Sequence, residues 1–289
     1  MLKTKQRSLS PSVPMTEGSL WKNILIFSLP LMLSQILQVL FNMADVAIVG
    51  KFSSSNAMGS VGSTSILVTL FTGFLIGMGA GVNVRVAQLL GAKRQEDTEK
   101  ALHTALLLCV LTGVIISGLC IFSAEWMLRL IRKRDDLLEG AELYFRIYAL
   151  GMPAMGVFNF GNGVMSANGD TRRPLMYLLT AGILNVIMNL FFVIVCNMAE
   201  DGVALSSIIS QYITAVLILV HMFRDKSACG LRLRSIRFWR GCSVPILVLG
   251  IPAGIQNAIF AVANLFIQRS VNYFDTVMVN GNSAASNAD

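Results

Sequence analysis

Seven long stretches of the sequence contain no Asp, Glu, Lys or Arg, and this pattern limits the folds that the chain can adopt. The first, residues 23–44, holds 22 consecutive uncharged residues, enough for an α-helix that spans a lipid bilayer. The others cover 52–84, 101–124, 147–169, 174–199, 202–223 and 241–268. We therefore expect an all-α integral membrane protein with seven spanning segments.

Composition and charge support a membrane location and suggest an orientation. Hydrophobic residues make up 54% of the chain and charged residues only 13%, whereas soluble domains carry about 25% charged residues. If the N-terminus is cytoplasmic, the inner connections hold 16 Lys and Arg and the outer ones hold 6. Because cytoplasmic loops carry the excess of basic residues, we expect a cell (inner) membrane protein with its N-terminus inside. The basic cluster at 129–134, on the outer side, is the exception.

The first span carries a polar stripe that ends in a carboxylate. Gln35, Gln38, Asn42 and Asp45 follow one another at intervals of 3, 4 and 3 residues, so they share one narrow arc of a helix. An Asp at the centre of a membrane helix costs about 2.5–3.5 kcal/mol, so this arc should face an aqueous cavity or other helices. The alternative, that Asp45 only caps the helix near the outer interface, stays open.

Two later spans carry polar side chains at helical spacing. The span over 174–199 holds Asn185 and Asn189, one turn apart. The span over 202–223 holds Ser207, Ser210, Gln211 and Thr214. Asp45 follows Pro30 by 15 residues, Asn189 follows Pro174 by 15, and Ser207 follows Gly202 by 5. We therefore expect Asp45, Asn189 and Ser207 to lie at one depth, in the outer half of the bundle.

The sequence contains no pattern typical of an enzyme, a cofactor site or a structural metal site. It lacks a His cluster, a paired carboxylate and an activated nucleophile. His103 and His221 have no metal-ligand partner at a useful spacing. The five cysteines form no CxxC pair and are most simply apolar helix fillers or free cytosolic thiols. We expect a protein that is not an enzyme and binds no cofactor.

The chain divides into four parts. Residues 1–19 form an expected cytosolic tail, 20–223 a first six-helix transmembrane lobe, 224–240 a basic cytosolic linker, and 241–289 the first helix of a second lobe. The linker carries Phe238 and Trp239 near its end. We expect it to lie on the inner membrane surface, where anionic lipid headgroups attract basic residues by about 1 kcal/mol each. Nucleic-acid binding is not expected, because no fold for it is present.

An internal repeat begins near Pro252. A shift of 222 residues places Pro30 on Pro252 and Asn42 on Asn264. Two six-helix repeats joined by a cytosolic linker place a substrate site at their interface, as in alternating-access transporters. The second repeat is not completed, so we expect a fragment whose partner is the missing second lobe. The sequence leaves open whether the gene product is truncated or the chain is incomplete.

Six segments carry a resemblance to a known family. They are SLPLMLSQILQVLFNMADVAIVG, AQLLGAKR, YFRIYALGMP, GDTRRPL, GILNVIMNLFFVI and GVALSSIISQ, in that order between residues 28 and 211. The sequence resembles the multidrug and toxic compound extrusion (MATE) family of cation-coupled efflux transporters. This resemblance implies two six-helix lobes around a central cavity. It also places the family's first-helix Asp on Asp45, its fifth-helix Asn on Asn185 and its sixth-helix Thr on Ser207.

The resemblance implies secondary active export of small organic cations or drugs in exchange for H⁺ or Na⁺. Asp45 would bind the coupling ion with Asn185, Asn189 and Ser207, while Gln35, Gln38, Asn42, Ser210, Gln211 and Thr214 would line the substrate cavity. Several relatives have a second acid where this chain has Asn189. Two alternatives remain: a lipid-linked oligosaccharide flippase of the same superfamily, which needs a cationic cavity, and a seven-helix receptor, which would be expected to have its N-terminus outside and no restart at Pro252.

Overall fold

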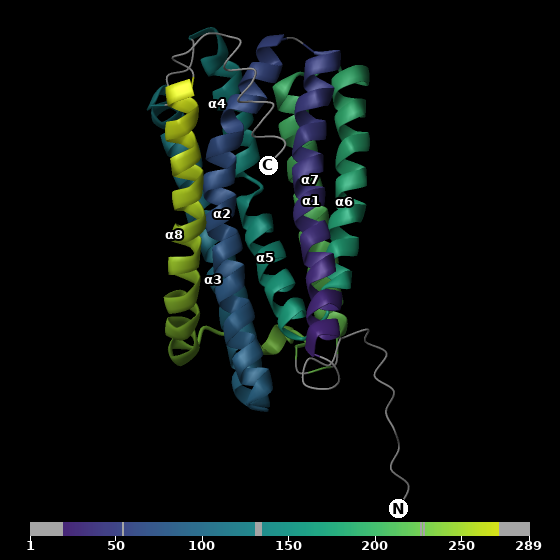
Figure 1. The fold of residues 1–289 in the computed structure, drawn as a ribbon, viewed down its shortest axis with the longest axis vertical. Coiled ribbons are helices and arrows are strands. Elements are labelled where there is room, and N and C mark those ends of the chain that lie inside the picture. The colour runs from purple at the N-terminus through teal and green to yellow at the C-terminus, as the bar shows by residue number, and fades with distance from the viewer. Residues whose placement is uncertain (1–19, 54, 131–134, 226, 228, 272–289) are drawn as a thin grey trace, which may run out of the picture.

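The computed structural model describes residues 20–53, 55–130, 135–225, 227 and 229–271, and the regular elements within these residues are all helical. They are α1 (Leu20–Phe52), α2 (Ser55–Gly91), α3 (Gln95–Leu130), α4 (Asp135–Ala149), α5 (Met152–Ala167), α6 (Arg172–Leu190), the π-helix η1 (Phe191–Val195), α7 (Glu200–Arg224), the 3₁₀ helix η2 (Leu233–Ser235) and α8 (Arg240–Val271). Figure 1 shows the long helices running side by side, with α1 and α8 starting at the same end. The expected tail, 1–19, and the part of the second-lobe segment beyond Val271 lie outside the described residues.

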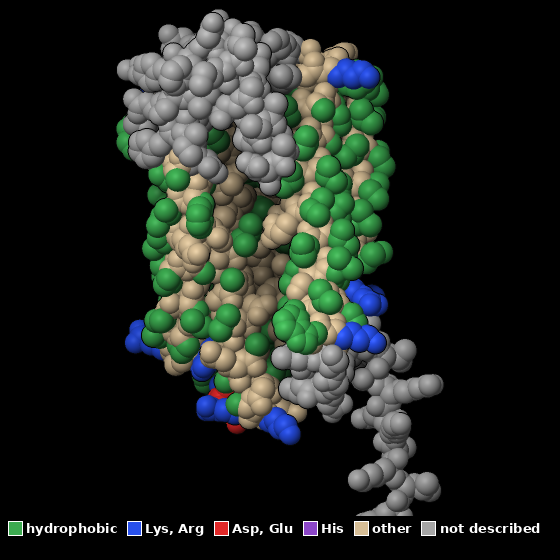
Figure 2. All heavy atoms as spheres, in the orientation of Figure 1, with side chains coloured by type: hydrophobic (Ala, Val, Ile, Leu, Met, Phe, Trp, Pro, Cys, Tyr) green, Lys and Arg blue, Asp and Glu red, His purple; other side chains and the backbone are tan. Residues whose placement is uncertain are grey.

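Within the described residues, six helices are long and apolar enough to cross a membrane: α1, α2, α3, α6 with η1, α7 and α8. Figure 2 shows hydrophobic side chains covering the flanks of these helices, with visible Lys and Arg side chains at the two ends. An apolar belt between charged ends is what a bilayer requires of the surface that it contacts. The prediction of an all-α integral membrane fold is confirmed.

The seventh expected span, 147–169, differs from the prediction because it is not one helix. α4 ends at Ala149, and α5 begins at Met152 and carries Pro153 at its start. A proline has no N–H with which to bond the carbonyl of the residue four positions earlier, so the helix stops and restarts here. The two short helices follow one another along the height of the bundle (Figure 1).

In the described part of the chain, the buried core forms two apolar clusters. One contains side chains of α1, α2, α3, α4 and α7. The other contains side chains of α2, α3, α5, α7 and α8, together with Cys229 and Leu231 from the connection between α7 and α8. The connection therefore packs into the helical core and is not a free loop.

The helix α8 packs against α2 through small residues. A Cβ at Gly77 of α2 would overlap the backbone of Ala253 and Gly254 in α8, so the two helices touch through their main chains. Asn257 Nδ2 also donates a hydrogen bond to the Gly73 carbonyl across 3.1 Å. Close packing of this kind is typical of membrane helices, because lipid provides no hydrophobic force to press helices together.

Candidate functional site

Asp45 lies in the last part of α1 and is almost entirely enclosed, with 6% of its surface exposed. It faces α6, which supplies Asn185 and Asn189, and α7, which supplies Ser207. All four side chains are buried. The expectation that these side chains reach one depth is therefore met in the structure, and the alternative that Asp45 only caps a helix end is wrong.

The four side chains close a ring of hydrogen bonds. Asn189 Nδ2 donates to Asp45 Oδ1 at 2.5 Å and to Asn185 Oδ1 at 3.2 Å. Asn185 Nδ2 donates to Ser207 Oγ at 3.4 Å, and Ser207 Oγ donates to Asp45 Oδ2 at 3.3 Å. Each carboxylate oxygen therefore accepts one hydrogen bond from a neutral group. Among the described residues, no Lys, Arg or His forms an ion pair with Asp45.

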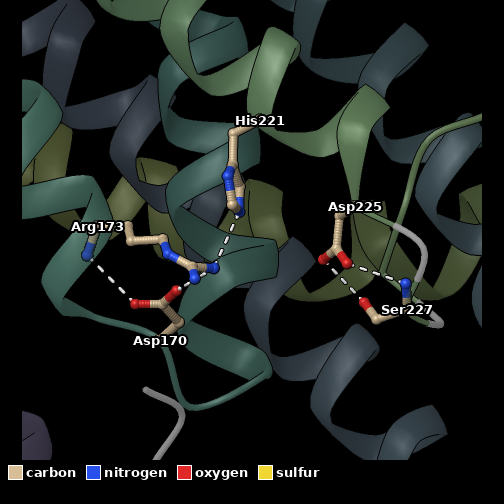
Figure 3. A network of polar contacts seen from close by, with 5 residues as sticks. All are labelled: Asp170, Arg173, His221, Asp225 and Ser227. Carbon is tan, nitrogen blue, oxygen red and sulfur yellow. Dashed lines mark hydrogen bonds and ion pairs between the residues drawn. The ribbon is translucent and has the colours of Figure 1, made fainter. Parts of the chain in front are cut away.

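A second polar network fixes α6 and α7, the two helices that supply the neutral members of the ring (Figure 3). Arg173, at the start of α6, contacts Asp170 Oδ2 at 3.1 Å and His221 Nε2 at 3.2 Å, near the end of α7. An arginine can only donate, so His221 Nε2 accepts and the imidazole is neutral in this contact. Thr171 Oγ1 donates to the Phe27 carbonyl of α1 across 3.3 Å. The three helices that supply the ring, α1, α6 and α7, are thus also joined at the far end of the bundle, where α1 and α6 begin and α7 ends.

A cavity of about 170 Å³ adjoins the ring. Its lining includes Asp45, Asn185 and Ser207 together with five of the six residues expected to contact substrate: Gln38, Asn42, Ser210, Gln211 and Thr214. Ser210 and Thr214 donate to carbonyls of their own helix, whereas Gln211 Oε1 is buried without a hydrogen-bond partner among the described residues. Gln211 therefore has a free acceptor within the wall of the cavity.

Gln35 does not join this cavity. It shares its arc of α1 with Gln38, but it lies one turn nearer the start of the helix, is exposed, and is absent from the lining. The spacing of the stripe placed it correctly around the helix axis. On α1 the lining begins at Gln38. Spacing within one helix carries no information about where the neighbouring helices leave space.

The family can now be stated, because a family model described as MatE matches residues 30–191, more than half of the chain. The chain belongs to the MatE family. It is similar to the "Probable multidrug resistance protein YpnP" of Bacillus subtilis (strain 168), with 28% identity over 95% of this chain and 61% of that protein. It is also similar to the "Multidrug export protein MepA" of Staphylococcus saprophyticus, with 22% identity over 87% of this chain and 56% of that protein.

Solved structures of the MatE family share the fold. The structure described as "Crystal structure of MATE in the bent conformation" superposes with a TM-score of 0.86 at 22% identity, over 96% of this chain and 62% of that chain. The chain thus spans about three fifths of the length of the relatives named here. The resemblance to multidrug and toxic compound extrusion transporters is confirmed, and MatE proteins are multi-pass membrane transporters, not enzymes.

Three residues beside the ring of this MatE-family chain were not anticipated from the sequence. Ser206 Oγ lies 2.6 Å from Asn189 Oδ1 and 2.7 Å from the Gly202 carbonyl, so these two acceptors share its one proton. Tyr144 and Tyr148 of α4 stack with ring centroids 5.9 Å apart, line the cavity and lie within electrostatic range of Asp45. The spacing of the two tyrosines by four residues was a usable signal, but α4 lies mostly outside the stretch expected to span the membrane.

Proposed function

We propose that this chain forms the first lobe of a secondary active antiporter that exports small organic cations in exchange for H⁺ or Na⁺ by alternating access. The second lobe is the required partner, and the protein lies in the cell (inner) membrane with its N-terminus in the cytoplasm. The excess of Lys and Arg in the connections on the side of the N-terminus supports this orientation.

The observation that carries the proposal is the unbalanced charge of Asp45. A buried carboxylate is costly unless it is paired with a cation or protonated, and here its neighbours are two amides and a hydroxyl. A single proton neutralises the group. A sodium ion does so as well, because carboxylate, amide and hydroxyl oxygens are the ligands that hard cations prefer. A proton fits the ring as it stands, whereas a sodium ion requires the Asn189 amide, which donates its N–H to Asp45, to turn its oxygen toward the carboxylate.

The cavity supports a cationic substrate. Its lining contains one acid, Asp45, and no Lys, Arg or His among the described residues. The charge of the residues that line a pore selects the charge of the molecule that passes through it. A lipid-linked pyrophosphate, the anionic substrate of the flippase alternative, is therefore disfavoured. Membership of a transporter family sets the receptor alternative aside. Pockets for drug-sized molecules measure about 300–1,000 Å³, so the cavity of this lobe needs either the second lobe or a movement of its helices to hold one.

Ion binding to the purified chain tests the proposal without the second lobe. The midpoint of thermal unfolding, Tm, is measured in nanodiscs in Na⁺ and in choline at constant ionic strength, and proton uptake is measured with a pH indicator. A ligand that binds only the folded state raises Tm as its concentration rises. We expect wild type to respond to one of the two ions and Asp45→Asn to respond to neither.

Asp201→Asn is the matched control, because Asp201 accepts a hydrogen bond from the Ala199 N–H outside the ring. We expect this variant to keep the ion response of wild type. If Asp45→Asn responds to Na⁺ and to protons as wild type does, the proposed coupling site is wrong.

A further inference from the structure

The connection between α7 and α8, residues 225–239, is fixed against the start of α3. Arg232 N donates to His103 Nε2 at 3.1 Å, and Trp239 N donates to Thr104 Oγ1 at 3.2 Å. The Leu231 N–H bonds to the Met222 carbonyl at 2.9 Å. Leu231 and Cys229 are buried. The stretch from Arg232 to Trp239 is therefore held at both ends by hydrogen bonds to His103 and Thr104, which are adjacent in α3.

His103 is the central anchor of this connection. Its side chain is fully buried, and its Nδ1 lies 2.7 Å from the Glu99 carbonyl, which can only accept. Nδ1 therefore carries a proton. Nε2 lies 3.1 Å from both the N and the carbonyl oxygen of Arg232, and in the neutral ring it accepts the Arg232 N–H. Both ring nitrogens of this neutral imidazole are used for positioning the backbone, a role that is outside the proposed transport chemistry.

The anchored segment presents a concentrated positive charge. By sequence, nine basic residues lie in the connection or on the adjoining parts of α2, α3 and α8, at 85, 93, 94, 100, 226, 232, 234, 237 and 240, against four acids at 96, 97, 99 and 225. Glu96, Asp97 and Glu99 pair with Lys100, Arg94 and Arg232, and Asp225 accepts hydrogen bonds from Ser227. Among the described residues, Arg234, Arg237 and Arg240 form no ion pair, and all three are exposed. Figure 2 shows basic side chains gathered at the end of the molecule where α8 begins.

Arg85 of α2 adds an unsatisfied donor to this charge. Its Nε is buried and has no hydrogen-bond partner among the described residues. The Cys242 thiol, at the start of α8, lies within electrostatic range of both Arg85 and Lys100, so the two cations are near one another where α2, α3 and α8 meet. The half-buried Arg85 therefore adds a positive charge, and a donor that lacks an acceptor among the described residues, to this end of the bundle.

Exposed aromatic side chains accompany the charge. The Trp239 ring lies 5.3 Å from Lys100 Nζ and 6.0 Å from the Arg237 guanidinium carbon. Trp239 and its neighbour Phe238 are both exposed. Tryptophan beside basic residues is typical of the level of the lipid headgroups, where the ring contacts the acyl boundary and the cations contact phosphate.

We propose that Arg85, Lys100, Arg234, Arg237, Trp239 and Arg240 form a binding surface for the headgroup of an anionic phospholipid, held in shape by His103. The surface is separate from the cavity beside Asp45. The phosphate contacts the unpaired arginines, and the acyl chains lie against the exposed aromatic rings.

The test compares lipid preference at Trp239. Replacing Trp21 and Trp126 by Phe leaves Trp239 as the only tryptophan of the chain. The nanodiscs contain either brominated phosphatidylglycerol in phosphatidylcholine or brominated phosphatidylcholine in phosphatidylglycerol. The quenching of Trp239 fluorescence in each mixture gives the relative affinity of the surface for the two lipids. We expect the wild-type surface to prefer phosphatidylglycerol. In the double variant Arg234→Gln with Arg237→Gln, the ratio of affinities for phosphatidylglycerol over phosphatidylcholine should fall about fivefold for each arginine removed. Arg85→Gln and His103→Ala should each reduce it.

Lys51→Gln with Arg129→Gln is the matched control, because it removes the same charge from the last turns of α1 and α3. It should keep the wild-type preference. Equal affinity of wild type for the two lipids, or equal loss in the control and in the arginine variant, overturns the proposal. Displacement of phosphatidylglycerol by inorganic phosphate at constant ionic strength also overturns it, because the surface would then take a free anion.

Discussion

Asn189 donates a hydrogen bond to Asp45 across 2.5 Å and so joins two helices that lie 144 residues apart in the sequence. The Asn189 amide bonds the single carboxylate of the ring and also contacts Asn185 and Ser206. The ring is thus complete with one negative charge. Any ion that neutralises Asp45 also changes the hydrogen bonds that hold α1 to α6 and α7.

The first prediction concerns the second lobe. Residues 1–289 expressed alone should not export ethidium, because the cavity is smaller than drug-sized pockets and the chain covers 61% of its relative YpnP. Co-expression with a second lobe of about five further helices should restore export if the six-helix repeat is the unit. Drug resistance from residues 1–289 alone would contradict this and would point to a homodimer.

The second prediction concerns Asp45 in the exporting form. Asp45→Asn should abolish ion-driven efflux of ethidium from vesicles while the protein remains in the membrane, because it removes the one acid that lines the cavity in the described part of the chain. The substitution is nearly isosteric and leaves no buried charge, so Tm should not fall. Asp201→Asn is expected to export at the wild-type rate. Wild-type efflux by Asp45→Asn would remove this carboxylate from the mechanism.

The third prediction distinguishes the coupling ions. Asn189→Asp places a second carboxylate within hydrogen-bond distance of Asp45, and two such groups titrate as a coupled pair. If the coupling ion is H⁺, the pH profile of efflux should move to higher pH without a requirement for Na⁺. If the coupling ion is Na⁺, efflux should reach half of its maximum at a lower Na⁺ concentration than in wild type. Vesicles with separately imposed pH and Na⁺ gradients distinguish the two outcomes, and no response to either gradient would place the site elsewhere.

The fourth prediction separates two adjacent serines of α7. Ser206→Ala removes the hydroxyl that donates to Asn189 Oδ1 and should destabilise the fold by about 1–3 kcal/mol, the cost of a buried unsatisfied group. Ser207→Ala should instead weaken the response of Tm to the coupling ion, because Ser207 contacts Asp45 directly. Ser207→Thr keeps the hydroxyl and should retain that response. Identical behaviour of the two alanine variants would show that the serines have no separate roles.

The fifth prediction concerns the contact between α2 and α8. Gly77→Ala should lower the stability by about 1–3 kcal/mol, because its methyl group overlaps the backbone of Gly254 and forces the helices apart. Gly62→Ala is the control on the same helix, since a methyl group there meets no atom within 4 Å. Its Tm should be unchanged or higher. The same Tm for both variants would contradict the close packing of α8 on α2.

The sequence by itself determined the membrane class, the extent of most spans and the polar residues of the ring. These properties are local: charge-free length gives the span, and the period of the helix gives the face on which Asp45, Asn185 and Asn189 lie. The motifs identified the family for the same reason, because they are read along the chain.

Only the tertiary structure decided how those faces meet. It excluded Gln35 from the cavity, brought Tyr144 and Tyr148 to Asp45, and divided the 147–169 span at Gly151. It also gave His103, which had no partner in the sequence, a partner 129 residues away. These outcomes depend on the depth and neighbours of each helix, which are set by packing between distant segments. The spacing of residues within one helix carries no record of that packing.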